Sequence, residues 1–179
     1  MKAKLIYFFA FIPLLAACSL LKDATDVTIS TDLEAYIPVV VSSAGKKSIE
    51  QTGVVNEIGF TKTQDLTLAS NADIEPYLSN IKEINLNSLV VTVTGLNADQ
   101  TINSLSLDVT GVGNLFTQTN ITMTNNSFTP VISATILDQA ATKLLNDKEI
   151  TLTVSGSASG AMTFTVGLIL DADIVANAL

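Results

Sequence analysis

Ile150-Thr151-Leu152-Thr153-Val154 decides the fold, because apolar and hydroxyl side chains alternate along it without a break. Successive side chains of an extended strand point to opposite faces, so this stretch has one apolar face and one polar face. The same alternation recurs over residues 162–166 and, after a more apolar start, over residues 89–94. These stretches predict half-buried strands of antiparallel sheets, in which one face packs on a core and the other meets water.

Further strand candidates lie at residues 33–42, 59–68, 104–109, 119–124 and 128–132, separated by glycine- and asparagine-containing turns. Gly156-Ser157-Ala158-Ser159-Gly160 predicts that the last two strands form a hairpin, closed by Asp171 and Asp173. Many short strands without alternating helices predict a mainly β protein. We expect an antiparallel β-sandwich, immunoglobulin-like or similar, with one to two short α-helices.

Two segments have helical rather than strand spacing. Residues 133–146 place Leu137, Ala140, Ala141, Leu144 and Leu145 on one face, with Thr135 and Asp138 in capping-box positions. Residues 73–82 are shorter and place Ile74, Tyr77, Leu78 and Ile81 together, with Pro76 in the first turn. Both apolar faces are expected to join the core.

The composition excludes several classes of function. The 179 residues contain one cysteine and no histidine, and the formal net charge is −8 with lysine as the only basic residue type. Without histidine, neither a serine–histidine nor a cysteine–histidine nucleophile can be built, and the usual zinc ligand is missing. The acidic balance argues against nucleic acid and against a polybasic membrane patch. We therefore expect a protein that is not an enzyme and has no cofactor and no metal.

The N-terminus carries the most specific motif. Lys2 and Lys4 precede an unbroken apolar run over residues 5–15, the arrangement of a secretory signal peptide. This run ends in Leu15-Ala16-Ala17-Cys18, which resembles the lipobox of bacterial lipoproteins at all four positions. The resemblance implies lipid transfer to the Cys18 thiol and cleavage before Cys18. The only cysteine of the chain lies at the position that the motif requires.

The lipobox implies an organisation for the whole chain. Residues 1–17 are expected to be a signal peptide, residues 18–31 a lipidated N-terminus and tether, and residues 32–179 a single β-sandwich domain. The chain then resembles β-rich envelope lipoproteins. An aspartate directly after the cysteine would resemble an inner-membrane retention signal. Ser19 occupies this position instead, which favours the outer membrane, on its periplasmic side or at the cell surface. We expect a non-enzymatic binding or structural module with an unknown protein or glycan partner.

Other functions remain open from the residues alone. An apolar cavity between the sheets would suit a carrier of a lipid or other hydrophobic ligand. Asp171 and Asp173 share one strand face and would suit a carboxylate-based glycan hydrolase, although such a pair at a strand end is more often a solvated edge. Asn97, Asp99, Thr101, Asn103 and Asp108 loosely follow a calcium loop, but Ile102 replaces its turn glycine, so a polar hairpin loop is the better interpretation.

Overall fold

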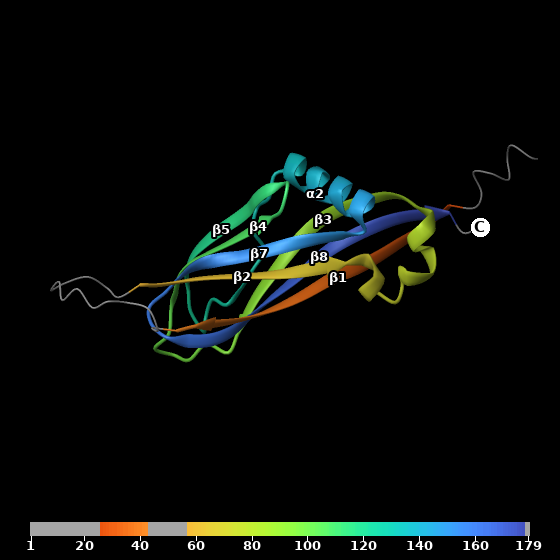
Figure 1. Cartoon of the computed structure of the whole chain (residues 1–179). Helices are drawn as coiled ribbons and strands as arrows, with labels where there is room; N and C mark the ends of the chain where they lie inside the picture. The colour runs from red at the N-terminus through yellow and green to blue at the C-terminus, as the bar shows by residue number, and fades with distance from the viewer. Residues whose placement is uncertain (1–25, 43–56, 178–179) are drawn as a thin grey trace, which may run out of the picture.

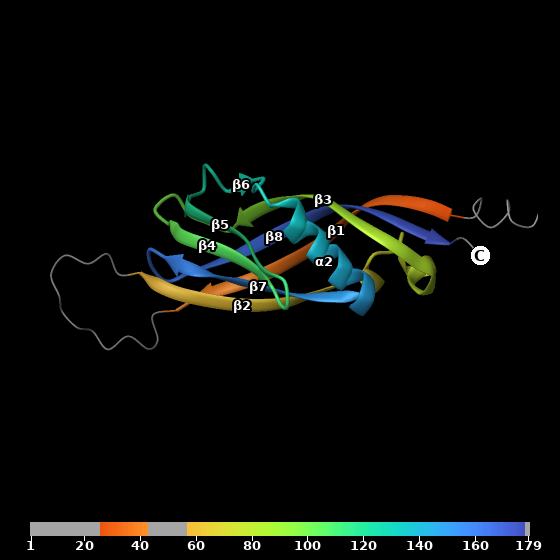
Figure 2. The same ribbon diagram turned by 90° about the horizontal axis from the view of Figure 1, so that it is seen from above.

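The computed structural model describes residues 26–42 and 57–177. Two four-stranded antiparallel sheets pack face to face, as Figures 1 and 2 show from two directions. The first sheet has the strand order β1-β8-β3-β6, and the second has the order β2-β7-β4-β5. The predicted mainly β architecture with an antiparallel sandwich is therefore confirmed.

Within residues 26–42 and 57–177, the elements are eight strands, two 3₁₀ helices (η1 and η2) and one α-helix. Their bounds are β1 Asp26–Val41, β2 Ile58–Thr67, η1 Leu68–Ser70, η2 Glu75–Asn80, β3 Ile81–Thr94, β4 Ile102–Val109, β5 Gly113–Ile121, β6 Ser127–Phe128, α2 Ala134–Asp147, β7 Glu149–Ala158 and β8 Met162–Asn177.

The core lies between the two sheets and follows the alternation seen in the sequence. In β8, every second residue from Met162 to Ala176 is buried, and the intervening residues face outward, except at the buried Gly167. Phe164 of β8 meets Phe60 of β2 edge to face, with ring centroids 5.3 Å apart. This contact joins the two sheets, because β8 and β2 belong to different layers.

The last two strands do not form the predicted hairpin. β7 pairs with β2 and β4, whereas β8 pairs with β1 and β3, so the turn after Ala158 carries the chain from one sheet to the other. β8 also continues to Asn177, because the apolar alternation persists through Ile174 and Ala176. Asp171 and Asp173 consequently lie within a central strand and not at the end of a hairpin.

The helix predicted over residues 133–146 is confirmed as α2, but its cap differs. Ser133 is the N-cap and accepts a hydrogen bond from the Ile136 amide, so Thr135 lies inside the helix and not at the capping position. Lys148 ends the helix in the left-handed conformation, and its amide donates to the Leu144 carbonyl. Ala140, Ala141 and Leu144 are buried, and α2 packs on β3 and β7.

The second predicted helix, over residues 73–82, is wrong in type and extent. Only Glu75–Asn80 is helical, as the 3₁₀ helix η2, and Ile81 and Lys82 already belong to β3. A short helix gains little from its own hydrogen bonds, whereas pairing of Ile81 with Ala176 extends a sheet that is already formed. Ile74 is nevertheless buried, as its place in the apolar pattern predicted.

Several strand limits differ from those expected. β1 begins at Asp26, within the tether that was expected to reach residue 31, and it pairs with β8 from Asp26 opposite Asn177 to Val41 opposite Met162. β5 runs from Gly113 to Ile121 and so contains only the first half of the predicted 119–124 strand, and β6 is reduced to two residues. The predicted tether extended too far along the chain, because the polar residues at the start of β1 lie on its exposed face and resemble a linker in sequence.

Candidate functional site

The structure places the sequence-predicted site residues that it describes in two different regions. Cys18, the expected site of lipidation, lies outside the described residues together with the rest of the lipobox. Asp171 and Asp173 lie on the outer face of β8, between β1 and β3. The residues of the loosely calcium-like run lie at the β3–β4 connection and along β4.

The calcium-like run does not form a cation loop. Asn97 and Gln100 close a turn on each other, with the Gln100 amide donating to the Asn97 carbonyl at 3.1 Å. Ile102 is buried at the start of β4, and Asp108 lies near the opposite end of that strand. This turn connects strands of different sheets and is therefore not a hairpin loop. In residues 26–42 and 57–177, no three acidic or other metal-ligating side chains gather in a group that could hold a metal.

Asp173 is held by two side chains from the neighbouring strands. It accepts hydrogen bonds from the Ser30 hydroxyl of β1 and, at 3.0 Å, from the Asn87 amide of β3. These two hydrogen bonds lower the pKa of the Asp173 carboxyl below its ordinary value, and the bond from Ser30 has the larger effect. A general acid requires the opposite shift, so Asp173 is unsuited to donate a proton to a glycosidic oxygen.

Removing the Ser30 hydroxyl is expected to raise the pKa of Asp173. A depressed carboxyl pKa stabilises the folded protein above the pKa of the unfolded chain, and this stabilisation disappears as the pH falls through the folded value. The Ser30→Ala protein should therefore lose stability relative to wild type at neutral pH, and the difference should vanish in acid. A carbon-13 NMR titration of the Asp173 carboxyl measures the pKa directly.

Thr28→Ala provides the matched control, since Thr28 lies on the same face of β1 but opposite Val175. Thr28→Ala should leave the pKa of Asp173 unchanged. A titration of Asp173 that stays unchanged in Ser30→Ala would contradict the assigned cause.

The strand register places Asp171 opposite another acidic residue. That residue is Asp32 of β1. The Asp32 carbonyl accepts a hydrogen bond from the Asn71 side chain, so the backbone groups of Asp32 point away from β8. Asp32 and Asp171 therefore form a pair without ladder hydrogen bonds, the kind in which opposite side chains lie closest. Like charges directly opposite each other in a sheet are destabilising.

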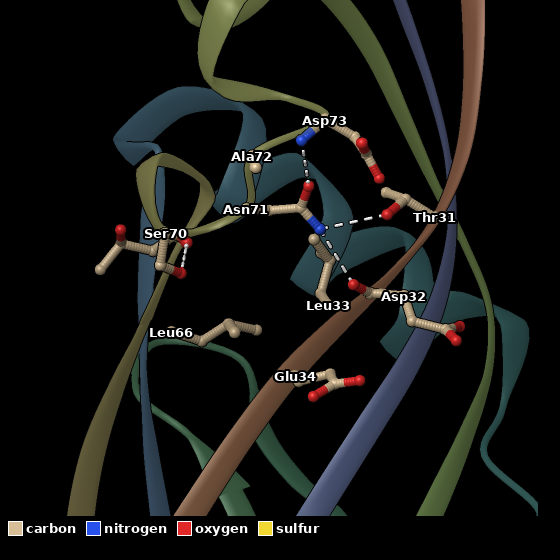
Figure 3. A pocket seen from close by; sticks show the side chains of 10 residues that line it. Thr31, Asp32, Leu33, Glu34, Leu66, Ser70, Asn71, Ala72 and Asp73 are labelled. Atoms are coloured by element: carbon tan, nitrogen blue, oxygen red, sulfur yellow. Dashed lines mark hydrogen bonds between the residues drawn. The ribbon is translucent and has the colours of Figure 1, made fainter.

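A pocket of about 440 Å³ lies at the free edge of β1. Figure 3 shows it between β1, the end of β2 and the segment that follows η1. Asn71 anchors this segment: its amide donates to the Thr31 hydroxyl at 3.1 Å and to the Asp32 carbonyl at 3.0 Å. The side-chain carbonyl oxygen of Asn71 accepts a hydrogen bond from the backbone amide of Asp73 at 2.9 Å, which forms an Asx turn.

The pocket has an apolar floor and an acidic wall. Leu33 and Leu66 are buried at its base, whereas Asp32, Glu34 and Asp73 are exposed around it. This arrangement attracts cationic groups and repels anionic ones. Sequence reasoning missed the site, although the Ser70-Asn71-Ala72-Asp73 turn composition could have located the segment that closes it.

The outer face of the second sheet has a different chemistry, dominated by hydroxyl groups. Serine and threonine side chains of adjacent strands bond one another across it: Ser104 to Ser157 at 3.1 Å, and Ser106 to Thr117 at 2.8 Å. Thr151 donates to Asp65 at 2.7 Å. The polar positions of the alternating pattern therefore satisfy one another, as expected for an ordinary solvent face of an antiparallel sheet.

The comparisons with known proteins add no relative. The chain matches no protein-family model, no curated protein and no solved structure. Over the described ranges, none of the helices has both the length and the apolar character needed to cross a membrane.

Proposed function

We propose that the protein is an exported, lipid-anchored envelope lipoprotein whose β-sandwich acts as a non-enzymatic binding module. The complete lipobox at Leu15-Ala16-Ala17-Cys18 carries this proposal. One acyl chain holds a protein only marginally, whereas two or more hold it stably at a membrane. The absence of an aspartate at position 19 favours the outer membrane as the site of attachment.

The position of β1 supports this arrangement. Asp26, the first residue of β1, lies eight residues after Cys18, a distance of at most about 29 Å when the chain is fully extended. The start of β1 and the end of β8 lie at the same pole of the sandwich (Figure 1), because Asp26 pairs with Asn177. An anchor at Cys18 would hold this pole near the lipid, with the opposite pole about 50 Å away along the 16 residues of β1.

Cys18→Ala is expected to abolish lipid attachment while leaving the sandwich folded. The wild-type protein should be recovered in the membrane fraction with a mass equal to residues 18–179 plus acyl groups. The variant should lack the lipid mass and remain as the uncleaved precursor or appear in the aqueous fraction. Intact-mass measurement and fractionation of whole cells test both statements.

Ser19→Ala is the control, because it changes a neighbouring residue and leaves the lipobox cysteine in place. It should be lipidated like the wild type. A wild-type mass without lipid, or one that retains Met1, would overturn the proposal. The circular dichroism spectrum of Cys18→Ala should stay β-rich, since the described sandwich begins only at Asp26.

A further inference from the structure

The outer face of the β1-β8-β3-β6 sheet concentrates negative charge. We define the acidic face as Asp32, Glu34, Glu83, Asp171 and Asp173, which come from three adjacent strands. The register places Asp32 beside Asp171, Glu34 beside Ile169, and Glu83 beside Val175. Among the described residues of this sheet, Lys82 is the only basic one, and it forms an ion pair with Asp26. The five carboxylates therefore have no cationic partner on their own sheet.

Apolar side chains continue the acidic face toward the opposite pole. Tyr36 and Val40 of β1 are 58% and 71% exposed, and Ile169 and Val90 lie partly exposed on the adjacent strands. Val90 is opposite Ile169, and Ile169 is opposite Glu34, so carboxylates and apolar groups are neighbours in the sheet. Exposed apolar groups next to like charges are typical of a surface that is covered by a partner.

The Tyr36 ring lies next to Gly167 of β8, the residue opposite it in the register. A β-carbon added to Gly167 would be 3.3 Å from Cε1 of Tyr36, so the glycine leaves room for the ring to lie against the sheet. The Tyr36 hydroxyl donates to Glu34 at 2.9 Å, which fixes the ring beside a carboxylate. A tyrosine ring with an adjacent carboxylate suits a lysine or arginine, because the ring face attracts cations and the carboxylate pairs with them.

The face is not optimised for the isolated domain. The Asp32–Asp171 pair places like charges opposite each other, and Tyr36 and Val40 leave apolar area in water. A cationic partner would relieve the first of these destabilising features, and an apolar partner the second. Local conflicts of this kind are expected at functional surfaces.

We propose that the acidic face docks a cationic protein segment in which basic side chains alternate with apolar ones. Charge complementarity identifies the partner, since five carboxylates exclude anionic lipid head groups and nucleic acid. The proposal specifies the partner class of the proposed binding module, and it rests on that function but not on the lipid anchor.

The test measures binding of a labelled peptide, five lysines alternating with five leucines, to the mature full-length protein in phosphatidylcholine nanodiscs. Fluorescence anisotropy should show saturable binding that weakens about tenfold or more as ionic strength rises from about 0.01 M to about 1 M. The corresponding glutamate–leucine peptide should not bind. No saturable binding of the lysine peptide, or equal binding of both peptides, would overturn the proposal.

Matched variants localise the binding. Asp32→Asn/Asp171→Asn removes two charges from the acidic face and should weaken binding about fivefold. Asp65→Asn/Asp108→Asn removes two charges from the other sheet and should change it less than about twofold. An equal loss in both would overturn the proposal, because it would reflect net charge alone. Thermal unfolding of the acidic-face variant should occur no lower than in wild type, since the substitutions relieve repulsion.

Soluble Cys18→Ala protein, titrated in parallel, distinguishes failure of the anchor from failure of docking. Peptide binding by this variant supports the acidic face even if the membrane experiment fails. Normal membrane attachment with no peptide binding overturns the docking proposal and leaves the anchor intact.

Discussion

Gly156→Ala is expected to destabilise the domain by about 3 kcal/mol or more, at or beyond the upper end of the usual overpacking range. Gly156 lies in β7, between β2 and β4, and its missing side chain leaves space for both neighbours. A β-carbon there would lie 1.9 Å from the Ser104 carbonyl oxygen and 2.9 Å from Cζ of Phe60. The ring could move, but the carbonyl belongs to the paired strand, so β4 would have to separate from β7.

The clash coincides with an irregularity in the sheet. The β4–β7 register shifts between Ile102 and Ser104, which brings the Ser104 carbonyl toward β7. Thermal unfolding followed by circular dichroism should show a fall in Tm of about 10 °C. Gly160→Ala is the control, because nothing lies within 4 Å of the added carbon, and it should change Tm little. Equal stability of the two variants would show that β4 adjusts freely.

Phe164→Ala is expected to lower the free energy of unfolding by about 3–5 kcal/mol. Phe164 is almost completely buried, at 1% exposure, and its ring is the partner of Phe60 across the core. Truncation would leave a cavity between the two sheets and remove an aromatic contact. Urea unfolding at neutral pH measures the loss from the transition midpoint and slope.

Phe164→Leu keeps most of the apolar volume and should lose markedly less than the alanine variant. Phe128→Ala is a second control, since Phe128 contacts Phe116 at the other side of the sandwich and is only partly buried. A loss below about 1 kcal/mol in Phe164→Ala would mean that the sheets close over the vacated space.

The sequence allowed the fold class to be predicted because the local patterns were strong. The alternation in β7 and β8 identified strands, and the apolar spacing around Leu144 identified α2. The sequence did not show which sheet each strand joins, because the short turn after Ala158 is compatible both with a hairpin and with a crossing between the two layers. That choice depends on β1 and β3, which flank β8 from distant parts of the chain.

The candidate site was less predictable. Asp171 and Asp173 were recognised as a pair on one strand face, but their neighbours were not. Asp32 and Ser30 meet them only through the β1–β8 register, and Asn87 only through β3. Asn71 was missed because its role is to bond the free edge of β1, a partner 39 residues earlier in the sequence. Such contacts have no local signal.

The full-length pairing of β1 with β8 has a mechanical consequence. If the chain is anchored at Cys18 and a partner holds the face of β8, tension would act along β1, parallel to the strands. The ladder from Asp26 opposite Asn177 to Val41 opposite Met162 would then resist in shear, with its hydrogen bonds strained together and not opened one after another. A tether attached in this geometry tolerates more force than one that peels a strand from its end.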